Sequence, residues 1–155
     1  MILETKPLKR VKELQPLSRE HHHGLLLCWK IRTGFSRNIA PERIKRYSDW
    51  FYTTYLLPHF ELEEEYVFSI LKSDNELVKK ALSEHRRLRR LFNQGINIEK
   101  NLGLIEEELE AHIRFEERVL FPEVQKVASR EQLVKIAEIH HEDEFVENEK
   151  DVFWK

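Results

Sequence analysis

The sequence predicts an all-α protein, an up-down antiparallel four-helix bundle with an additional short C-terminal helix. Apolar residues recur with the period of a helix, and the alternation typical of strands is absent. Charged residues of mixed sign make up 35% of the chain, with only 4 Gly and 5 Pro, as in long solvated helices. Two halves also repeat: each is a helix with one histidine, then a helix with His-x-x-x-Glu, and two such hairpins pack as a bundle.

Length and charge restrict the class of protein. The chain of 155 residues is one domain of ordinary size, so we expect a single domain over residues 1–155. The formal net charge of −2 gives no electrostatic sign of a nucleic-acid or membrane partner. Cys28 is the single cysteine, which excludes an internal disulfide, and no apolar run is long enough to span a bilayer. The segment 1–10 lacks the apolar core of a signal peptide, so we expect a cytoplasmic protein.

Five helices are expected, at about residues 18–35, 41–71, 73–95, 97–127 and 131–147. The bundle would span about 17–127, and the C-terminal helix and tail 130–155. Pro58 and Pro122 each remove a backbone donor and should bend their helices. Ser73 with Glu76 predicts a capping box at the start of the third helix.

Six ionisable side chains lie in the middle of apolar stripes on four of these helices: His21, His59, Glu63, His85, His112 and Glu116. Residues four apart share a helix face, so His59 with Glu63, and His112 with Glu116, can each bind a metal from one helix. Imidazole suits iron, zinc and copper, and a carboxylate can bridge two ions. Two bridging glutamates and two histidines per ion would leave coordination positions open for water, a bridging oxide, O2 or NO.

The simpler interpretation of these residues is structural. A lone histidine on an apolar face is usually a satisfied core residue, and His-x-x-x-Glu is often a surface pair. Six such groups together favour a metal site over the structural interpretation. Burying two uncompensated glutamates would cost several kcal/mol each, against a total stability of roughly 5–15 kcal/mol. A network of protonated histidines and glutamates would compensate in part. A metal centre is the interpretation that the sequence favours.

The residues resemble the hemerythrin-like family, whose members carry the His-His-Glu cation-binding domain. The matching pieces are Leu17-Ser-Arg-Glu-His21, His59-Phe-x-x-Glu63-Glu64, Glu84-His85, and His112-x-x-x-Glu116-Glu117 leading into Leu120-Phe121-Pro122. They cover about residues 17–127. The resemblance implies an up-down four-helix bundle with a non-haem di-iron centre, bridged by oxide or hydroxide, that binds or senses O2 or NO, reacts with peroxide, or handles iron.

One position departs from the family pattern. The oxygen-carrying members have a second histidine one turn after the histidine of the third helix, where this chain has Arg89. Four histidines instead of five would leave one iron more open, which argues against reversible O2 carriage. The chain looks more like the bacterial branch of the nitric-oxide and oxidative-stress response, which includes proteins that repair iron centres. Those repair proteins usually carry an extra cysteine-containing N-terminal domain, which these 155 residues lack.

Two ligand assignments stay open between neighbours. His21 is favoured over His22 by the apolar stripe and by the internal repeat, but His22 lies about 100° round the helix and is an alternative. The repeat favours Glu116, whereas a five-residue spacing, which also occurs in the family, would select Glu117. The ligand set does not choose between iron, zinc and manganese.

Other residues are given no role in the site. His140 and His141 are expected on a solvated acidic face, with a loose second metal site as the alternative. Tyr55 and Tyr66 could donate protons, but packing is the favoured role, so no catalytic residue is named and enzyme activity stays open. The competing function is a helical protein-interaction module with a structural or absent metal. Oligomerisation also stays open.

Overall fold

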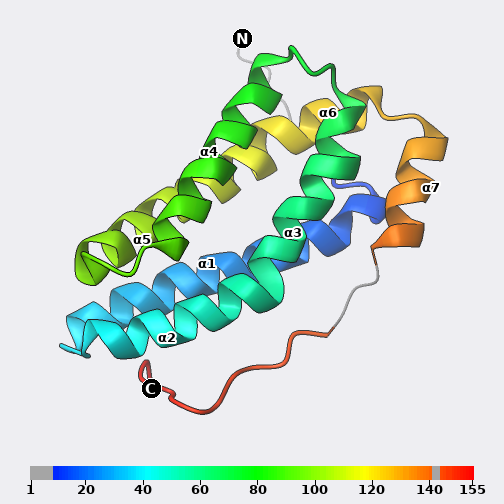
Figure 1. Cartoon of the computed structure of the whole chain (residues 1–155). Helices are drawn as coiled ribbons and strands as arrows, with labels where there is room; N and C mark the ends of the chain where they lie inside the picture. Colours follow the sequence, from blue (N-terminus) through cyan, green and yellow to red (C-terminus); the bar gives the residue numbers. More distant parts are fainter. Residues whose placement is uncertain (1–8, 141–143) are drawn as a thin grey trace, which may run out of the picture.

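The computed structural model describes residues 9–140 and 144–155, and all regular structure in these two ranges is helical (Figure 1). The all-α prediction is therefore confirmed. The α-helices are α1 (Gln15–Ser36), α2 (Pro41–Phe51), α3 (Leu57–Leu62), α4 (Glu76–Asn93), α5 (Ile98–Phe115), α6 (Phe121–Val127) and α7 (Arg130–Ile139). In the described part of the chain, no helix has the length and apolarity needed to cross a membrane.

Two of the expected long helices form continuous helical runs, but short parts of each run are wound as wider π-turns. The first run joins α2 and α3 through Tyr52–Leu56 and continues through a π-turn at Glu63–Val67 and a 3-10 turn at Phe68–Ile70. The second joins α5 and α6 through Glu116–Leu120. Pro58 and Pro122 each occupy the second position after a π-turn, where a missing N–H disturbs the regular hydrogen bonding. π-turns are rare and concentrate at functional sites.

Two helix boundaries differ from the expected ones. α4 begins after Asn75, whose side chain accepts hydrogen bonds from the Leu77 and Val78 amides at 2.8 and 3.4 Å. The expected capping box at Ser73 is therefore wrong, because Asn75 already satisfies those free amides. The last helix ends at Ile139 rather than near 147. Beyond it, residues 144–155 have no helix and bury Phe153 and Trp154 against the rest of the protein.

The helices pack side by side around two apolar clusters (Figure 1). α1 lies against α5 and α2, and α4 also lies against α5. The larger cluster contains residues such as Leu27, Ile31, Phe51, Leu109 and Ile113. The smaller one contains residues such as Leu17, Val67, Ala81, Leu120 and Phe121.

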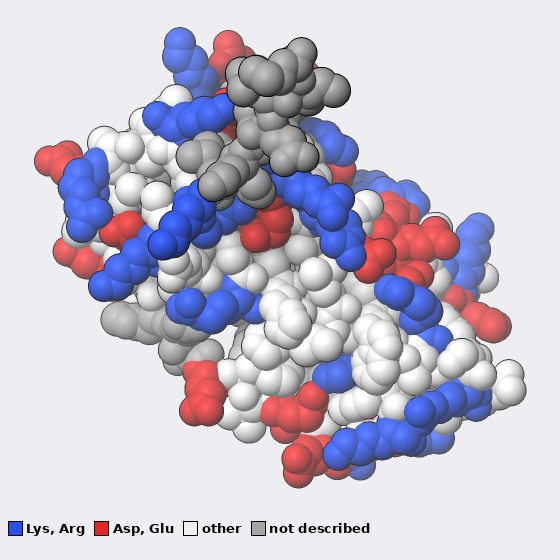
Figure 2. All heavy atoms as spheres, turned by 180° about the vertical axis from the view of Figure 1, so that it is seen from behind, with Lys and Arg blue, Asp and Glu red and all other residues white. Residues whose placement is uncertain are grey.

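The segment 144–155 covers the outside of the larger cluster. It runs back along α2, and the C-terminus lies near the turn between α1 and α2 (Figure 1). The buried Lys30 ammonium donates hydrogen bonds to the Tyr47 hydroxyl at 2.7 Å and the Glu147 carboxylate at 2.6 Å. Seen from behind, positive and negative side chains are interspersed around a stretch of uncharged surface (Figure 2).

Candidate metal centre

The six side chains singled out in the sequence form a buried polar layer between the two apolar clusters. Each helical run that contributes to the layer passes from one apolar cluster, through the polar residues, to the other apolar cluster. On α1, for example, His21 lies between Leu17 and Leu27. All six are buried: His21, His59, Glu63, His85, His112 and Glu116. The fold thus brings together residues almost a hundred positions apart.

The polar layer divides into two groups that share both glutamates. In the first, one ligand atom from each of His21, His59, Glu63 and Glu116 lies within 4.8 Å of the other three. In the second, the same is true of Glu63, His85, His112 and Glu116. Each group has two imidazoles and two carboxylates, so each matches the ligand set of a single metal ion.

Each shared carboxylate turns one oxygen toward each group. Glu63 Oε2 lies 3.1 Å from His59 Nε2, and Glu63 Oε1 lies 3.3 Å from His85 Nε2. Glu116 Oε1 lies 2.9 Å from His21 Nε2, and Glu116 Oε2 lies 3.3 Å from His112 Nε2. A carboxylate with its two oxygens directed at two separate pairs of imidazoles has the geometry of a bridging ligand.

A second set of glutamates holds the outer nitrogen of each histidine. Every Nδ1 lies 2.7 Å from a carboxylate oxygen, in the pairs His21–Glu117, His59–Glu20, His85–Glu64 and His112–Glu84. An Nδ1–H that donates to a carboxylate leaves the Nε2 lone pair directed at the centre of the layer. These contacts fix the ring orientations and raise the basicity of the nitrogens that face the centre.

The internal repeat explains this outer set. In each half, the glutamate before the first histidine contacts the second histidine of its own half, as Glu20 contacts His59. The glutamate after the shared carboxylate contacts the first histidine of the other half, as Glu64 contacts His85. The Glu-His and Glu-Glu doublets are visible in the sequence, but nothing in their spacing indicates a role for Glu20, Glu64 or Glu84.

The two neighbouring candidates lie outside both groups. Glu117 contacts the outer nitrogen of His21 and accepts a hydrogen bond from the Ser18 hydroxyl at 2.9 Å. His22 is exposed on α1, away from the polar layer. His21 and Glu116 are therefore the members of these adjacent pairs whose side chains face the shared centre.

The buried carboxylates of the layer need positive charge beside them. Burial opposes protonation of His59, yet Glu63 and Glu20 raise its pKa to about 9. Burial opposes protonation of His112 as well, and Glu116 and Glu84 raise its pKa to about 10. Burial favours the neutral form of Glu63, but the surrounding histidines hold its pKa well below the usual value. Protons or metal ions must therefore neutralise the carboxylates.

The atoms at the centre of the layer are of the kinds that bind metal ions. Within residues 9–140 and 144–155, both oxygens of Glu63 and Glu116 and the Nε2 atoms of His21 and His59 make contacts but no well-formed hydrogen bond. Buried polar atoms without such bonds are rare in proteins. Imidazole nitrogens and carboxylate oxygens are ligands that iron, manganese and zinc accept. The residues present therefore fit a pair of such ions.

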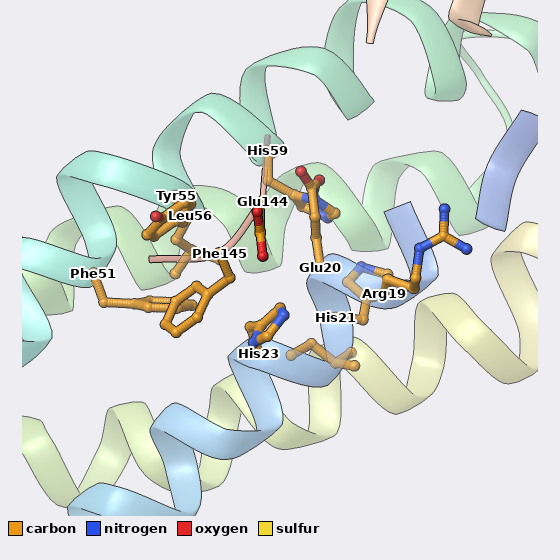
Figure 3. Close-up of a pocket in the computed structure, with 12 residues that line it drawn as sticks. Arg19, Glu20, His21, His23, Phe51, Tyr55, Leu56, His59, Glu144 and Phe145 are labelled. Carbon is orange, nitrogen blue, oxygen red and sulfur yellow. Dashed lines mark hydrogen bonds and ion pairs between the residues drawn. The ribbon is translucent and has the colours of Figure 1, made fainter. Parts of the chain in front are cut away.

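The first of the two groups borders a cavity. A cavity of about 490 Å³ reaches His21 and His59 between α1, α3 and the C-terminal segment (Figure 3). The other group is enclosed by aromatic rings: Phe60 stacks on His85 with ring centroids 3.9 Å apart, and Phe68 lies 5.3 Å away. Among the described residues, the cavity thus meets the polar layer on the side of His21 and His59.

Two further residues approach the layer from outside. Arg89 contacts the Glu64 carboxylate and does not join the centre. His140 Nε2 lies 3.2 Å from Glu20 Oε2, and its side chain is only 10% exposed. The expected solvated position of His140 is therefore wrong, because the side chain turns toward α1. His141 lies outside the described residues.

Comparison with known proteins adds no relative: no protein-family model, curated protein or solved structure matches this chain. What is established is an all-α protein with buried histidine and glutamate groups that could hold metal ions.

Proposed function

We propose that the chain is a hemerythrin-like, non-haem di-iron protein that binds, senses or reacts with O2, NO or peroxide. Its helical runs, α1, α2 with α3, α4, and α5 with α6, would form an up-down antiparallel four-helix bundle. The observation that carries the proposal is the sharing of Glu63 and Glu116 between two pairs of buried histidines. Such an arrangement matches two ions held side by side by bridging carboxylates.

Each residue of the layer has a definite role in this proposal. His21 and His59 would hold one ion, His85 and His112 the other, and the shared glutamates would bridge them. Iron would supply redox chemistry and coordinate a diatomic ligand or peroxide, because four protein ligands leave positions open on a six-coordinate ion. The outer glutamates keep the imidazole rings aligned toward the centre.

The cavity supports a single route for the ligand. It borders His21 and His59, whereas Phe60 and Phe68 close off the group that contains His85. O2, NO or peroxide would approach through the cavity and meet the ion beside His21 and His59. The aromatic rings around His85 keep water from the second ion.

Metal content and the absorption spectrum of protein from iron-supplied cells test the proposal. We expect about two irons per chain, with near-ultraviolet bands that change on adding NO or peroxide. Glu63→Gln should lose iron and bands, because Glu63 is fully buried and faces both groups. Glu61→Gln is the matched control, since Glu61 is exposed on the same helical run.

One zinc ion per chain would overturn the di-iron proposal while leaving a metal site. A folded protein that binds no metal would favour the interaction module instead. The raised pKa values of His59 and His112 supply the physical basis for that alternative, because bound protons would then neutralise the shared carboxylates.

A further inference from the structure

We propose that the cavity beside His21 and His59 binds a small uncharged organic molecule with an apolar body and one hydrogen-bonding group. This inference deepens the proposed function. It rests on that function only in placing a metal ion next to the bound molecule. The cavity itself, its apolar walls and the placement of His23 carry the argument.

The size of the cavity exceeds the needs of a diatomic ligand. Its volume is about 490 Å³. A water molecule occupies roughly 30 Å³ of the liquid, and O2, NO and peroxide are of similar scale. Sites for organic ligands have volumes of about 300–1,000 Å³. The cavity therefore lies in the range of sites that enclose an organic molecule of ten or more non-hydrogen atoms.

The walls of the cavity divide into an apolar and a polar end. Phe51, Tyr55 and Phe145 gather at one end, and His21 and His59 lie at the other (Figure 3). The Phe145 and Tyr55 ring centroids are 5.0 Å apart. The apolar end would enclose the body of a ligand and leave its other end near the polar layer.

His23 places an imidazole ring on the cavity wall. Its ring stacks on Phe145 with centroids 4.3 Å apart, and its buried Nδ1 has no hydrogen-bond partner among the described residues. An imidazole nitrogen that faces the cavity can pair with a hydroxyl or amide group of a ligand.

The charged side chains of the lining disfavour an anion. Glu20 and Glu144 both border the cavity near His59 (Figure 3), together with a single arginine, Arg19. Glu20 already contacts His59 and His140. A carboxylate ligand would meet the charge of Glu144 without a free cation on the described part of the wall, so an uncharged molecule fits best.

Calorimetric titration with 2-naphthol tests the site. This probe has an apolar body, one hydroxyl group and no charge at pH 7, whereas 2-naphthoate has the same body with a negative charge. We expect saturable binding of one 2-naphthol per chain and binding of 2-naphthoate weaker by about tenfold. Naphthalene isolates the contribution of the hydroxyl group.

Two pairs of variants locate the binding. Phe145→Ala should weaken 2-naphthol binding by about tenfold through the loss of an aromatic wall. Val146→Ala is its control, because the neighbouring Val146 side chain is 67% exposed. His23→Phe should weaken 2-naphthol by about fivefold while sparing naphthalene, because the ring stack remains and the nitrogen is lost. His22→Phe, at an exposed neighbouring position, should change neither.

The outcomes separate this inference from the proposed function. In protein loaded with paramagnetic iron or manganese, the NMR signals of bound 2-naphthol should broaden because the ligand lies beside the metal. Saturable binding to a protein that takes up no metal would sustain the inference and defeat the di-iron function. The inference itself is overturned if 2-naphthol does not bind, if 2-naphthoate binds equally well, or if neither Phe145→Ala nor His23→Phe weakens binding.

Discussion

Arg89 and Glu64 are joined by two hydrogen bonds, 2.7 Å from Nη1 to Oε2 and 3.2 Å from Nη2 to Oε1. The same Oε2 lies 2.7 Å from His85 Nδ1. Arg89 thus acts on the polar layer through Glu64: burial raises the pKa of that carboxyl, but His85 and Arg89 together hold it below its usual value. Arg89 therefore supports one of the outer glutamates.

Removing this support should weaken metal binding without abolishing it. We expect Glu64→Gln to lower metal affinity by about 10–100-fold, because His85 loses its charged partner. Arg89→Ala should have a smaller effect in the same direction, since Glu64 would remain but be less firmly held. Competition with a chelator of known affinity measures both. Arg90→Ala, at an exposed position on α4, is the control, and an equal loss in that variant would refute the role of Arg89.

The metal-free protein should lose stability as the pH rises above neutrality. The pKa values of His59 and His112 in the folded protein are about 9 and 10, above the ordinary value of 6.5. Proton binding to these rings therefore stabilises the fold fully below about pH 6.5 and ceases to do so as the pH passes 9–10. Urea unfolding of metal-free protein at pH 6.5, 8 and 10 should show a falling midpoint. A midpoint that rises over this range would contradict the assignment of protons to the layer.

Metal binding should release protons near neutral pH. In the metal-free protein His59 and His112 carry protons at pH 7, and a metal ion must displace the protons on the nitrogens that bind it. Adding Zn²⁺ to weakly buffered metal-free protein at pH 7 should acidify the solution, and calorimetry in buffers of different ionisation enthalpy counts the protons. A His59→Ala variant should release fewer. Binding with no proton release at pH 7 would show that the ligands are already deprotonated.

The ring of Phe60 should contribute both to stability and to closure of the His85 side. It is 1% exposed and stacks on His85. We expect Phe60→Ala to lower the free energy of unfolding by about 3–5 kcal/mol through the lost contacts and the cavity left behind. Chemical denaturation measures the change. Trp29→Ala is a useful comparison, because Trp29 is 47% exposed and its removal should cost much less. Similar losses for the two variants would argue against the tight packing of Phe60.

The helical class and the membership of the polar layer could be predicted from the sequence because both depend on local periodicity. A period of 3.6 residues places His59 with Glu63 on one face, and His112 with Glu116 on another. The surrounding apolar stripes predict that these faces are buried. The internal repeat favoured Glu116, and Glu117 stayed open as an alternative only because a five-residue spacing also occurs in hemerythrin-like proteins.

Only the tertiary structure decided which atoms meet. The π-turns that begin at Glu63 and Glu116 are wider than α-helical turns. The side chains that follow them therefore point in directions that a fixed helical period does not predict. The partners of the outer nitrogens lie on other helices, so no spacing along the chain predicts that Glu20 holds His59. The end of the last helix at Ile139 likewise depends on long-range packing, because Phe153 and Trp154 are buried against the larger cluster in a non-helical segment. Local periodicity therefore determined which side chains face inward, and the packing of helices distant in sequence decided which of them face one another.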